Sequence, residues 1–258
     1  MNCVQKEQSE NKVVFEVNGI TSVYANTLRR LMLGEIPTLA IEDVSFKQND
    51  SVLYDEIIAH RLGLVVFKTD LDSYNMMSTC PCKGAGCPQC QVEMSLSVKG
   101  PKTVYAKDLV CKDPSVVPAQ PNTIIVKLAE NQVLDIFATA QLGLGKEHAK
   151  WSPGLVWYYN KPRIKVNNKS KDLADCKDKY PPQIFNDKGE IDTKKINTPS
   201  LIDACIDVSD AVHVEFEPDT FVFTIESFGA LPAQDIIRRA VKTFDKQIAH
   251  VESLVKEL

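Results

Sequence analysis

The sequence predicts an α+β fold, and the two ends of the chain carry the observations behind this prediction. Residues 13–17 form a β-branched and aromatic run of strand type, and an amphipathic helical pattern follows them. Residues 220–227 form a second run of strand type, and a second amphipathic helical pattern follows that one. Strands and amphipathic helices arranged in this way agree with an α+β layer.

The first helix is expected after a hydroxyl cap at Thr21 or Ser22, with apolar residues every three to four positions. Gly34 follows the last of these residues, and we expect a left-handed C-cap there. Arg29 and Arg30 are adjacent on this helix, and helix neighbours point about 100° apart. We therefore expect one arginine to face the fold and the other to face outward, although the pattern alone favours ordinary solvated charges.

The last helix carries a narrow apolar seam. From Ile237 to Leu258 the apolar positions are spaced by four and three residues in turn, an a/d pattern held for about three heptads. Phe244, Ile248 and Val251 occupy the middle of this seam. Two interpretations stay open, namely one face of an internal helix and a helix-pairing interface with another chain.

Four cysteines stand within eleven positions, at Cys80, Cys82, Cys87 and Cys90, with glycines and prolines between them. Four thiolates give a structural zinc ion its tetrahedral ligands and leave no open position for chemistry. Metal binding would also supply the folding energy that a loop with so few apolar residues lacks. A redox Cys-x-x-Cys and unligated thiols are the alternatives. The sequence therefore predicts one structural zinc ion.

Composition excludes several other classes of protein. The chain of 258 residues is 44% hydrophobic and 25% charged, as in ordinary globular proteins. A net charge of −4 argues against direct electrostatic binding of nucleic acid over a broad surface. We find no apolar run of about 18 residues and expect no membrane segment. The polar first twelve residues lack a signal peptide, so we expect a cytoplasmic protein, or a nuclear one if the source is eukaryotic.

The middle of the chain is rich in predicted strands. Residues 54–64 form a helical pattern, and we expect a short buried strand directly after it at 65–67. The remaining strand predictions are 38–46, 91–98, 122–128, 133–141 and 155–166.

Two tempting catalytic motifs fail on spacing. Gly143-x-Gly145-Lys146 lacks the longer glycine spacing and the Lys-Ser/Thr ending of a phosphate-binding loop. Glu147-His148 lacks the second histidine of a zinc-protease motif. An enzyme that uses His60 or His148 as a base is therefore the least favoured of the functions that the sequence suggests.

Three longer motifs stand in series with sensible gaps: Asn-Thr-Leu-Arg-Arg-Leu-Met (26–32), Ile-Pro-Thr-Leu-Ala-Ile-Glu (36–42) and Asp-Glu-Ile-Ile-Ala-His-Arg-Leu-Gly-Leu (55–64). Together they resemble the α-like assembly subunits of cellular RNA polymerases. The likeness is closest to the archaeal D subunit, whose relatives are the third-largest subunit of eukaryotic RNA polymerase II and bacterial α. The segment 143–150 is also similar to a stretch of the D subunit.

The resemblance implies a particular domain organisation. A dimerisation domain would come from both chain ends, 1–45 and 213–258, and a β-rich domain with the cysteine knot, 46–166, would be inserted between them. Residues 167–212 would be a small, degenerate ferredoxin-like module. Some archaeal relatives hold an iron–sulfur cluster there, but only Cys176 and Cys205 remain here. Two cysteines cannot supply four thiolates, so we expect no iron–sulfur cluster.

The resemblance also implies a function and partners. The chain would be a non-catalytic scaffold subunit of DNA-directed RNA polymerase, pairing with the small α-like L subunit through Phe244, Ile248 and Val251. Arg29 and Arg30, with Lys146 and Lys150, would contact the second-largest subunit, and the small zinc-bearing N and P subunits would dock as well. The alternative is a stand-alone zinc-knuckle module that binds RNA or protein. It would need exposed aromatic and basic residues near the knot.

Overall fold

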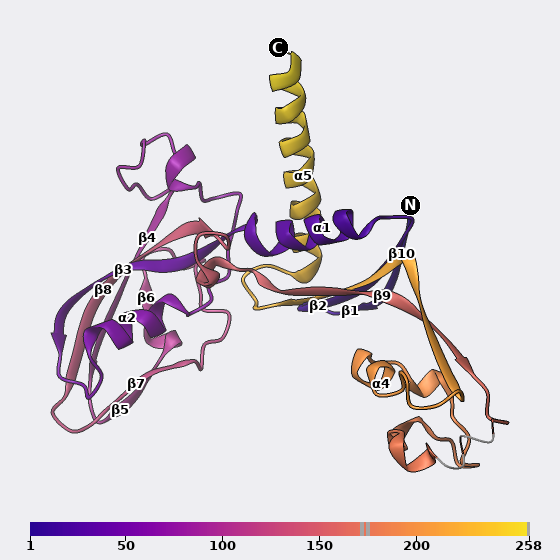
Figure 1. The fold of residues 1–258 in the computed structure, drawn as a ribbon. Coiled ribbons are helices and arrows are strands. Elements are labelled where there is room, and N and C mark those ends of the chain that lie inside the picture. Colours follow the sequence, from indigo (N-terminus) through magenta and orange to yellow (C-terminus); the bar gives the residue numbers. More distant parts are fainter. Residues whose placement is uncertain (171–172, 174–175, 257–258) are drawn as a thin grey trace. The chain divides into compact units, whose positions relative to one another are not determined.

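The computed structural model describes residues 1–170, 173 and 176–256. The chain divides into two compact units, each described below by itself. One unit comprises Met1–Val4, Glu16–Ser22 and Tyr158–Val222, and the other comprises the remaining described residues. Helices and several antiparallel sheets occur together, in agreement with the predicted α+β class (Figure 1).

Strands from the two chain ends belong to one four-stranded sheet of order β1-β2-β10-β9. The rings of Phe15 and Phe223 stack 5.2 Å apart, one from each end of the chain. Strand β1 escaped prediction because all seven of its residues are exposed and show no alternation of apolar and polar side chains. The strands are β1 (Asn2–Gln8), β2 (Lys12–Asn18), β9 (Gly154–Val166) and β10 (Val212–Ser227).

The two predicted amphipathic helices are present as α1 (Ser22–Gly34) and α5 (Ala233–Lys256). The left-handed cap expected at Gly34 is wrong, since Gly34 is the last residue of α1 and is not among the glycines with positive φ. Tyr24 of α1 meets Phe244 of α5 edge to face at 5.9 Å. Among the described residues, no helix is long and apolar enough to cross a bilayer.

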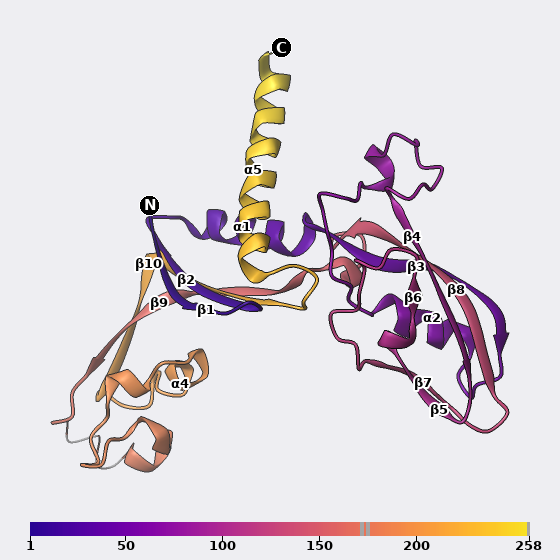
Figure 2. The same cartoon turned by 180° about the vertical axis from the view of Figure 1, so that it is seen from behind.

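The middle of the chain folds around a second, antiparallel sheet of order β3-β8-β4-β6, beside the antiparallel pair β5-β7. Helix α2 packs against β3 and β7 (Figure 2). Its Ile58 and Leu62 are fully buried in the core of this part. The elements are β3 (Pro37–Asn49), α2 (Asp55–Gly63), β4 (Gln91–Lys99), β5 (Lys102–Tyr105), β6 (Val110–Cys111), β7 (Ile124–Leu128) and β8 (Val133–Leu144).

The strand predicted at 65–67 is wrong. Phe67 forms only an isolated bridge with Pro118, flanked by hydrogen bonds from Lys68 N–H to Val117 O at 2.9 Å and from Ala119 N–H to Val66 O at 2.8 Å, and the pairing does not continue into a ladder. Phe67 is nevertheless fully buried, as the apolar run suggested.

Residues between β9 and β10 form a small body with its own apolar core, which includes Ile184, Ile202 and Cys205. Its regular structure includes short 3₁₀ turns and helix α4 (Pro199–Asp203). The two ends of this segment meet where Asn167 N–H donates to Ala211 O at 2.8 Å. The domain boundaries predicted above stay predictions.

Candidate functional site

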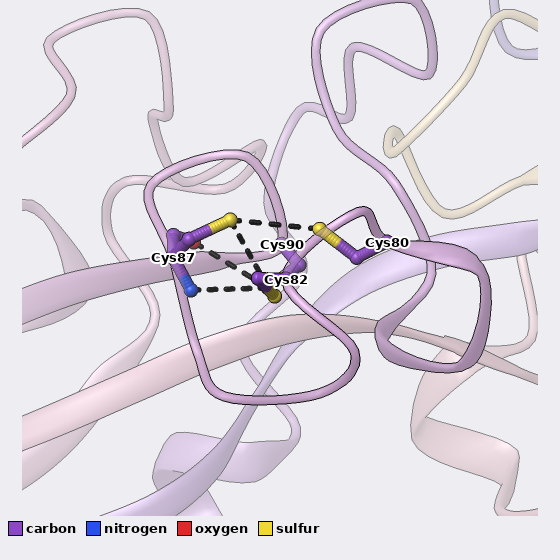
Figure 3. Close-up of side chains that lie close together, drawn as sticks. All are labelled: Cys80, Cys82, Cys87 and Cys90. Atoms are coloured by element: carbon purple, nitrogen blue, oxygen red, sulfur yellow. Dashed lines mark hydrogen bonds between the residues drawn. The ribbon is translucent and has the colours of Figure 1, made fainter.

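The four clustered cysteines converge on one point directly before β4 (Figure 3). The Sγ atoms of Cys80 and Cys87 lie 3.5 Å apart, those of Cys82 and Cys90 3.6 Å, and those of Cys87 and Cys90 3.8 Å. All four Sγ atoms fall within 4.8 Å of one another. The sequence prediction that these residues come together is confirmed.

This geometry fits a four-thiolate metal site. A tetrahedral zinc ion with Zn–S bonds of about 2.3 Å separates its sulfur ligands by about 3.8 Å, which is close to the three spacings above. A disulfide would bring two sulfurs to about 2.05 Å. The four cysteines can therefore hold one metal ion in a closed, structural site.

The backbone of residues 80–90, the cysteine knot, orients these side chains toward one another. Cys90 N–H donates to Cys87 O at 2.9 Å and Cys87 N–H donates to Cys90 Sγ at 3.2 Å, which closes the second turn. Gly84 and Gly86 take positive φ angles of 83° and 79°. Lys83 also lies in the left-handed region, with φ 56°, which the glycine pattern did not predict.

The thiols of the knot do not titrate alike. The hydrogen bond from the Cys80 thiol is the main cause that lowers the pKa of Cys82 to about 6. The backbone hydrogen bond with Cys82 acts to lower the pKa of Cys80, but desolvation and hydrogen bonds to the other thiols raise it to about 12. Because metal ligation needs thiolates, metal binding at neutral pH would release protons from this cluster.

The two arginines of α1 take different environments, as predicted. Arg29 is half-buried and donates through Nε and Nη2 to Asn26 Oδ1, at 3.2 and 2.9 Å. Arg30 is exposed and has no hydrogen-bond or ion-pair partner among the described residues. Arg30 is thus the arginine that is available to another molecule.

Arg30 and Lys146 line the same cavity of 490 Å³, beside the C-terminal end of α1. Lys146 Nζ pairs with Glu35 at 2.9 Å, and its side chain is 53% exposed. Lys146 N–H also donates to Gly34 O at 3.2 Å, which joins the segment after β8 to the end of α1. A Cβ at Gly145 would overlap the Leu33 carbonyl oxygen, so only glycine permits this approach.

Lys150, predicted beside Lys146 at an interface, instead lies largely inside the chain, with its side chain 13% exposed. Its Nζ donates to Ile41 O at 3.0 Å, pairs with the Glu42 carboxylate and lies 4.4 Å from the centroid of the Trp151 ring. The register of β3 against β8 is irregular between Ile41 and Asp43, so Lys150 satisfies a carbonyl at this irregularity.

Sequence reasoning missed the role of Trp151, which anchors the segment after β8. Trp151 is buried, its Nε1 donates to Gln141 O at 3.3 Å, and its carbonyl accepts from Thr38 Oγ1 at 2.7 Å. A Cβ at Gly143 would overlap the indole ring. The glycine that resembled a phosphate-loop residue is therefore required for packing. His148 Nδ1 accepts from Lys150 N–H at 3.1 Å, so this histidine caps a turn.

The predicted seam residues of α5 lie on an exposed face. Ala233, Ile236 and Ala240 are the buried side of this helix, whereas Ile248 is 43% and Val251 59% exposed. Together with Phe244 they line a groove of 660 Å³ formed by α5 residues. Within the described chain the seam is therefore not one face of an internal helix.

The segment compared with a ferredoxin-like module is filled by apolar side chains. Tyr180 is buried, and its hydroxyl lies 2.9 Å from Ser209 Oγ. Cys205 is fully buried among apolar residues, and Cys176 packs against the same core. These residues do not fit a four-thiolate iron–sulfur cluster.

A family model described as the RNA polymerase Rpb3/RpoA insert domain matches residues 39–154. That match covers the cysteine knot and the segment after β8.

Curated relatives match nearly the full length of the chain. DNA-directed RNA polymerase subunit Rpo3 of Archaeoglobus fulgidus is 36% identical over 98% of this chain and 97% of its own. The same subunit of Methanosphaera stadtmanae is 36% identical over 100% and 99%, and that of Pyrococcus horikoshii is 36% identical over 92% and 90%.

Proposed function

Because the chain belongs to the family of DNA-directed RNA polymerase subunit Rpo3, we propose that it is a non-catalytic scaffold on which the other polymerase subunits assemble. The observation that carries this proposal is the exposed apolar face in the distal part of α5, where Ile248, Val251 and Val255 remain open to solvent among the described residues. Exposed apolar faces of this kind mark protein–protein interfaces.

The α5 seam pairs with a small α-like partner, the counterpart of the archaeal L subunit. Phe244, Ile248 and Val251 supply apolar side chains at the spacing that helix pairing uses. Phe244 is braced by Tyr24, so α1 supports the seam from behind. The chain ends, 1–45 and 213–258, form the dimerisation domain in this proposal, and 46–166 forms the inserted domain.

The cavity beside α1 receives the second-largest polymerase subunit. Arg30 offers a guanidinium that no described residue pairs with, and Lys146 is the exposed cation beside it. Arg29 and Lys150 support this contact surface indirectly, since each is held by hydrogen bonds within the chain. The small zinc-bearing N and P subunits join the same assembly, and one zinc ion holds the cysteine knot.

The test is an affinity pull-down of the tagged chain from its native cells. The wild type should recover the two large subunits and a small α-like partner in equal amounts. Val251→Asp should lose the small partner, because a carboxylate would be buried in an apolar seam. Arg30→Glu should keep the small partner and recover at least about tenfold less of the second-largest subunit.

Lys127→Glu is the matched control for Arg30→Glu, since Lys127 is exposed on β7 outside both surfaces. It should behave as the wild type. Recovery of the wild-type chain alone, or with RNA and no polymerase, would overturn the scaffold function and favour a zinc-knuckle binding module.

A further inference from the structure

The distal half of α5 is presented to solvent on every side. From Asp245 to Lys256 each residue is exposed. The apolar groove of 660 Å³ runs along this stretch, and Glu252 lies on its lining beside Val251 and Val255. The charged groups that border this groove therefore contribute to the choice of its occupant.

The two borders of the seam differ in charge. Along residues 245–256 the heptad positions next to the seam on one side are Asp245 and Glu252, which are seven residues apart and so lie on the same face. Arg238 holds this position one heptad earlier, where it pairs with Asp235 at 3.2 Å. The positions on the other side are Gln247 and Leu254, which carry no charge. The seam thus has one acidic border and one neutral border.

The acidic border is not neutralised from within the chain. Neither Asp245 nor Glu252 makes an ion pair with another described residue. Lys256 lies one turn beyond Glu252 and also lines the groove, but it makes no ion pair with that carboxylate in the described structure. Lys242 and Lys246 belong to heptad positions away from the seam.

From this arrangement we infer that the α5 seam takes an amphipathic helix with a basic border, and that it discriminates against a second copy of this chain. The inference rests on the proposed function, because it names the chemistry of the partner at the same face. Lysine or arginine beside the partner's seam would meet Asp245 and Glu252, whereas Leu254 calls for an uncharged residue on the other border.

A second copy aligned along this stretch supplies no such cation. In an antiparallel pair that sets Asp245 of one copy opposite Glu252 of the other, the acidic borders face each other, so both residues would approach carboxylates. In a parallel pair in register Asp245 would face Ala240 and Glu252 would face Gln247, neither of which offers a positive charge. Both arrangements leave carboxylates without a cation beside an apolar contact. The antiparallel pair suffers charge repulsion and the parallel pair suffers desolvation of the carboxylates, and a basic partner avoids both costs.

Two synthetic helices of about four heptads test this inference on the full chain. Both carry the same apolar a and d residues, and they differ only in lysine or glutamate at the bordering positions. Fluorescence anisotropy at low salt should give the lysine-bordered helix at least about tenfold tighter binding. The double variant Asp245→Lys with Glu252→Lys should reverse this order.

The chain has a net charge of −4, so general attraction of a basic peptide must be separated from recognition. Glu7→Lys with Glu130→Lys makes the same change in net charge at two exposed sites outside α5, and it should keep the wild-type order. Sedimentation equilibrium should find the wild-type chain monomeric.

The inference would be overturned if the wild-type chain bound the two helices equally, preferred the acidic one or bound neither. Reversal of the order in the control variant would overturn it as well, and so would a wild-type dimer that is lost in Val251→Asp. The pull-down reports on the scaffold function separately. Loss of polymerase recovery with an intact peptide preference would reject the scaffold only, and the opposite result would reject this inference only.

Discussion

At the scale of single residues, the contact between Tyr74 and Asp113 ties the chain before the knot to the loop after β6. The Tyr74 hydroxyl donates to Asp113, whose other oxygen accepts from Ser115 N–H at 2.8 Å and from Ser115 Oγ at 2.6 Å. Hydrogen bonds from the Ser115 hydroxyl first, and then from Tyr74, lower the pKa of Asp113. Desolvation is the main cause that raises the pKa of Tyr74.

A lowered carboxyl pKa stabilises the fold at pH values above the unfolded pKa of about 3.9, and this contribution is lost as the pH falls through the lower folded pKa. Tyr74→Phe removes the hydrogen bond that the buried tyrosine hydroxyl donates, and it should lower the free energy of unfolding at pH 7 by about 1 kcal/mol. The difference from wild type should shrink as the pH falls below the unfolded pKa and through the lower folded pKa, where Asp113 becomes protonated in the folded protein. Urea unfolding at pH 7 and in acid measures both quantities.

Tyr54→Phe is the control for this experiment, because Tyr54 is 80% exposed. It should leave stability unchanged at both pH values. A Tyr74→Phe effect of equal size in acid would show that the hydroxyl acts through packing and not through the ionised Asp113.

Single residues also show what the sequence could and could not foretell. The four cysteines were predictable because only their spacing was needed. Lys146 and Lys150 are alike in the sequence, yet one is exposed and the other lies inside against Trp151. The difference in exposure between the two lysines depends on the irregular register of β3 against β8. A strand register cannot be predicted from a local sequence pattern.

At the scale of elements, the cysteine knot is a loop that lacks a core of its own. Cys87→Ser should reduce the metal content of the purified protein from about one ion per chain to a small fraction of that value, because a hydroxyl replaces a thiolate ligand. Elemental analysis by mass spectrometry measures this. Thermal unfolding should begin at a lower temperature for the same variant, since metal binding contributes to folding.

Cys3→Ser is the matched control for the metal, since Cys3 is an exposed thiol on β1. It should keep the full metal content. A wild-type protein that carries no zinc, or a Cys87→Ser variant that keeps it, would contradict the assignment. Iron in place of zinc would keep the four-thiolate site and change its metal.

The elements divide by how much local signal they carry. Strands β4 and β8 bury alternate residues over most of their length and gave a periodic signal. Strands β3 and β7 bury consecutive residues, and they were predictable, like β9, from runs of strand-type residues. Strand β1 buries nothing and gives no such signal. Gly34 was predicted as a helix cap and Gly143 was compared with a phosphate-binding loop, but Gly143 is required because a Cβ there would overlap the indole ring of Trp151. Tertiary contacts of this kind are invisible to spacing.

At the scale of the whole molecule, the segment between β9 and β10 is an insertion with adjacent ends. Replacing residues 169–209 by a two-residue Asn-Gly turn should leave a protein that folds, because Asn167 and Ala211 already form a hydrogen bond of 2.8 Å. Ile164 and Val214 pack on the core of the segment and should be changed to threonine in the same variant.

The excised protein should unfold in one transition, with a midpoint within a few degrees of the wild type. Circular dichroism during heating measures the midpoint. Aggregation of the excised protein, when a wild-type protein with the same two threonines stays soluble, would show that the rest of the fold depends on this segment.

The pairing of β2 with β10 has a consequence for synthesis. Ser227 N–H donates to Asn11 O at 2.7 Å and Gly19 N–H donates to Asp219 O at 2.9 Å, so the first strands cannot complete their sheet without some of the last residues. A ribosome must therefore release β10 before the sheet closes, while the middle of the chain can fold earlier. Proteins that bind α5 would thus join only copies synthesised through this helix, and translation products that stop before β10 would be left out of assembly.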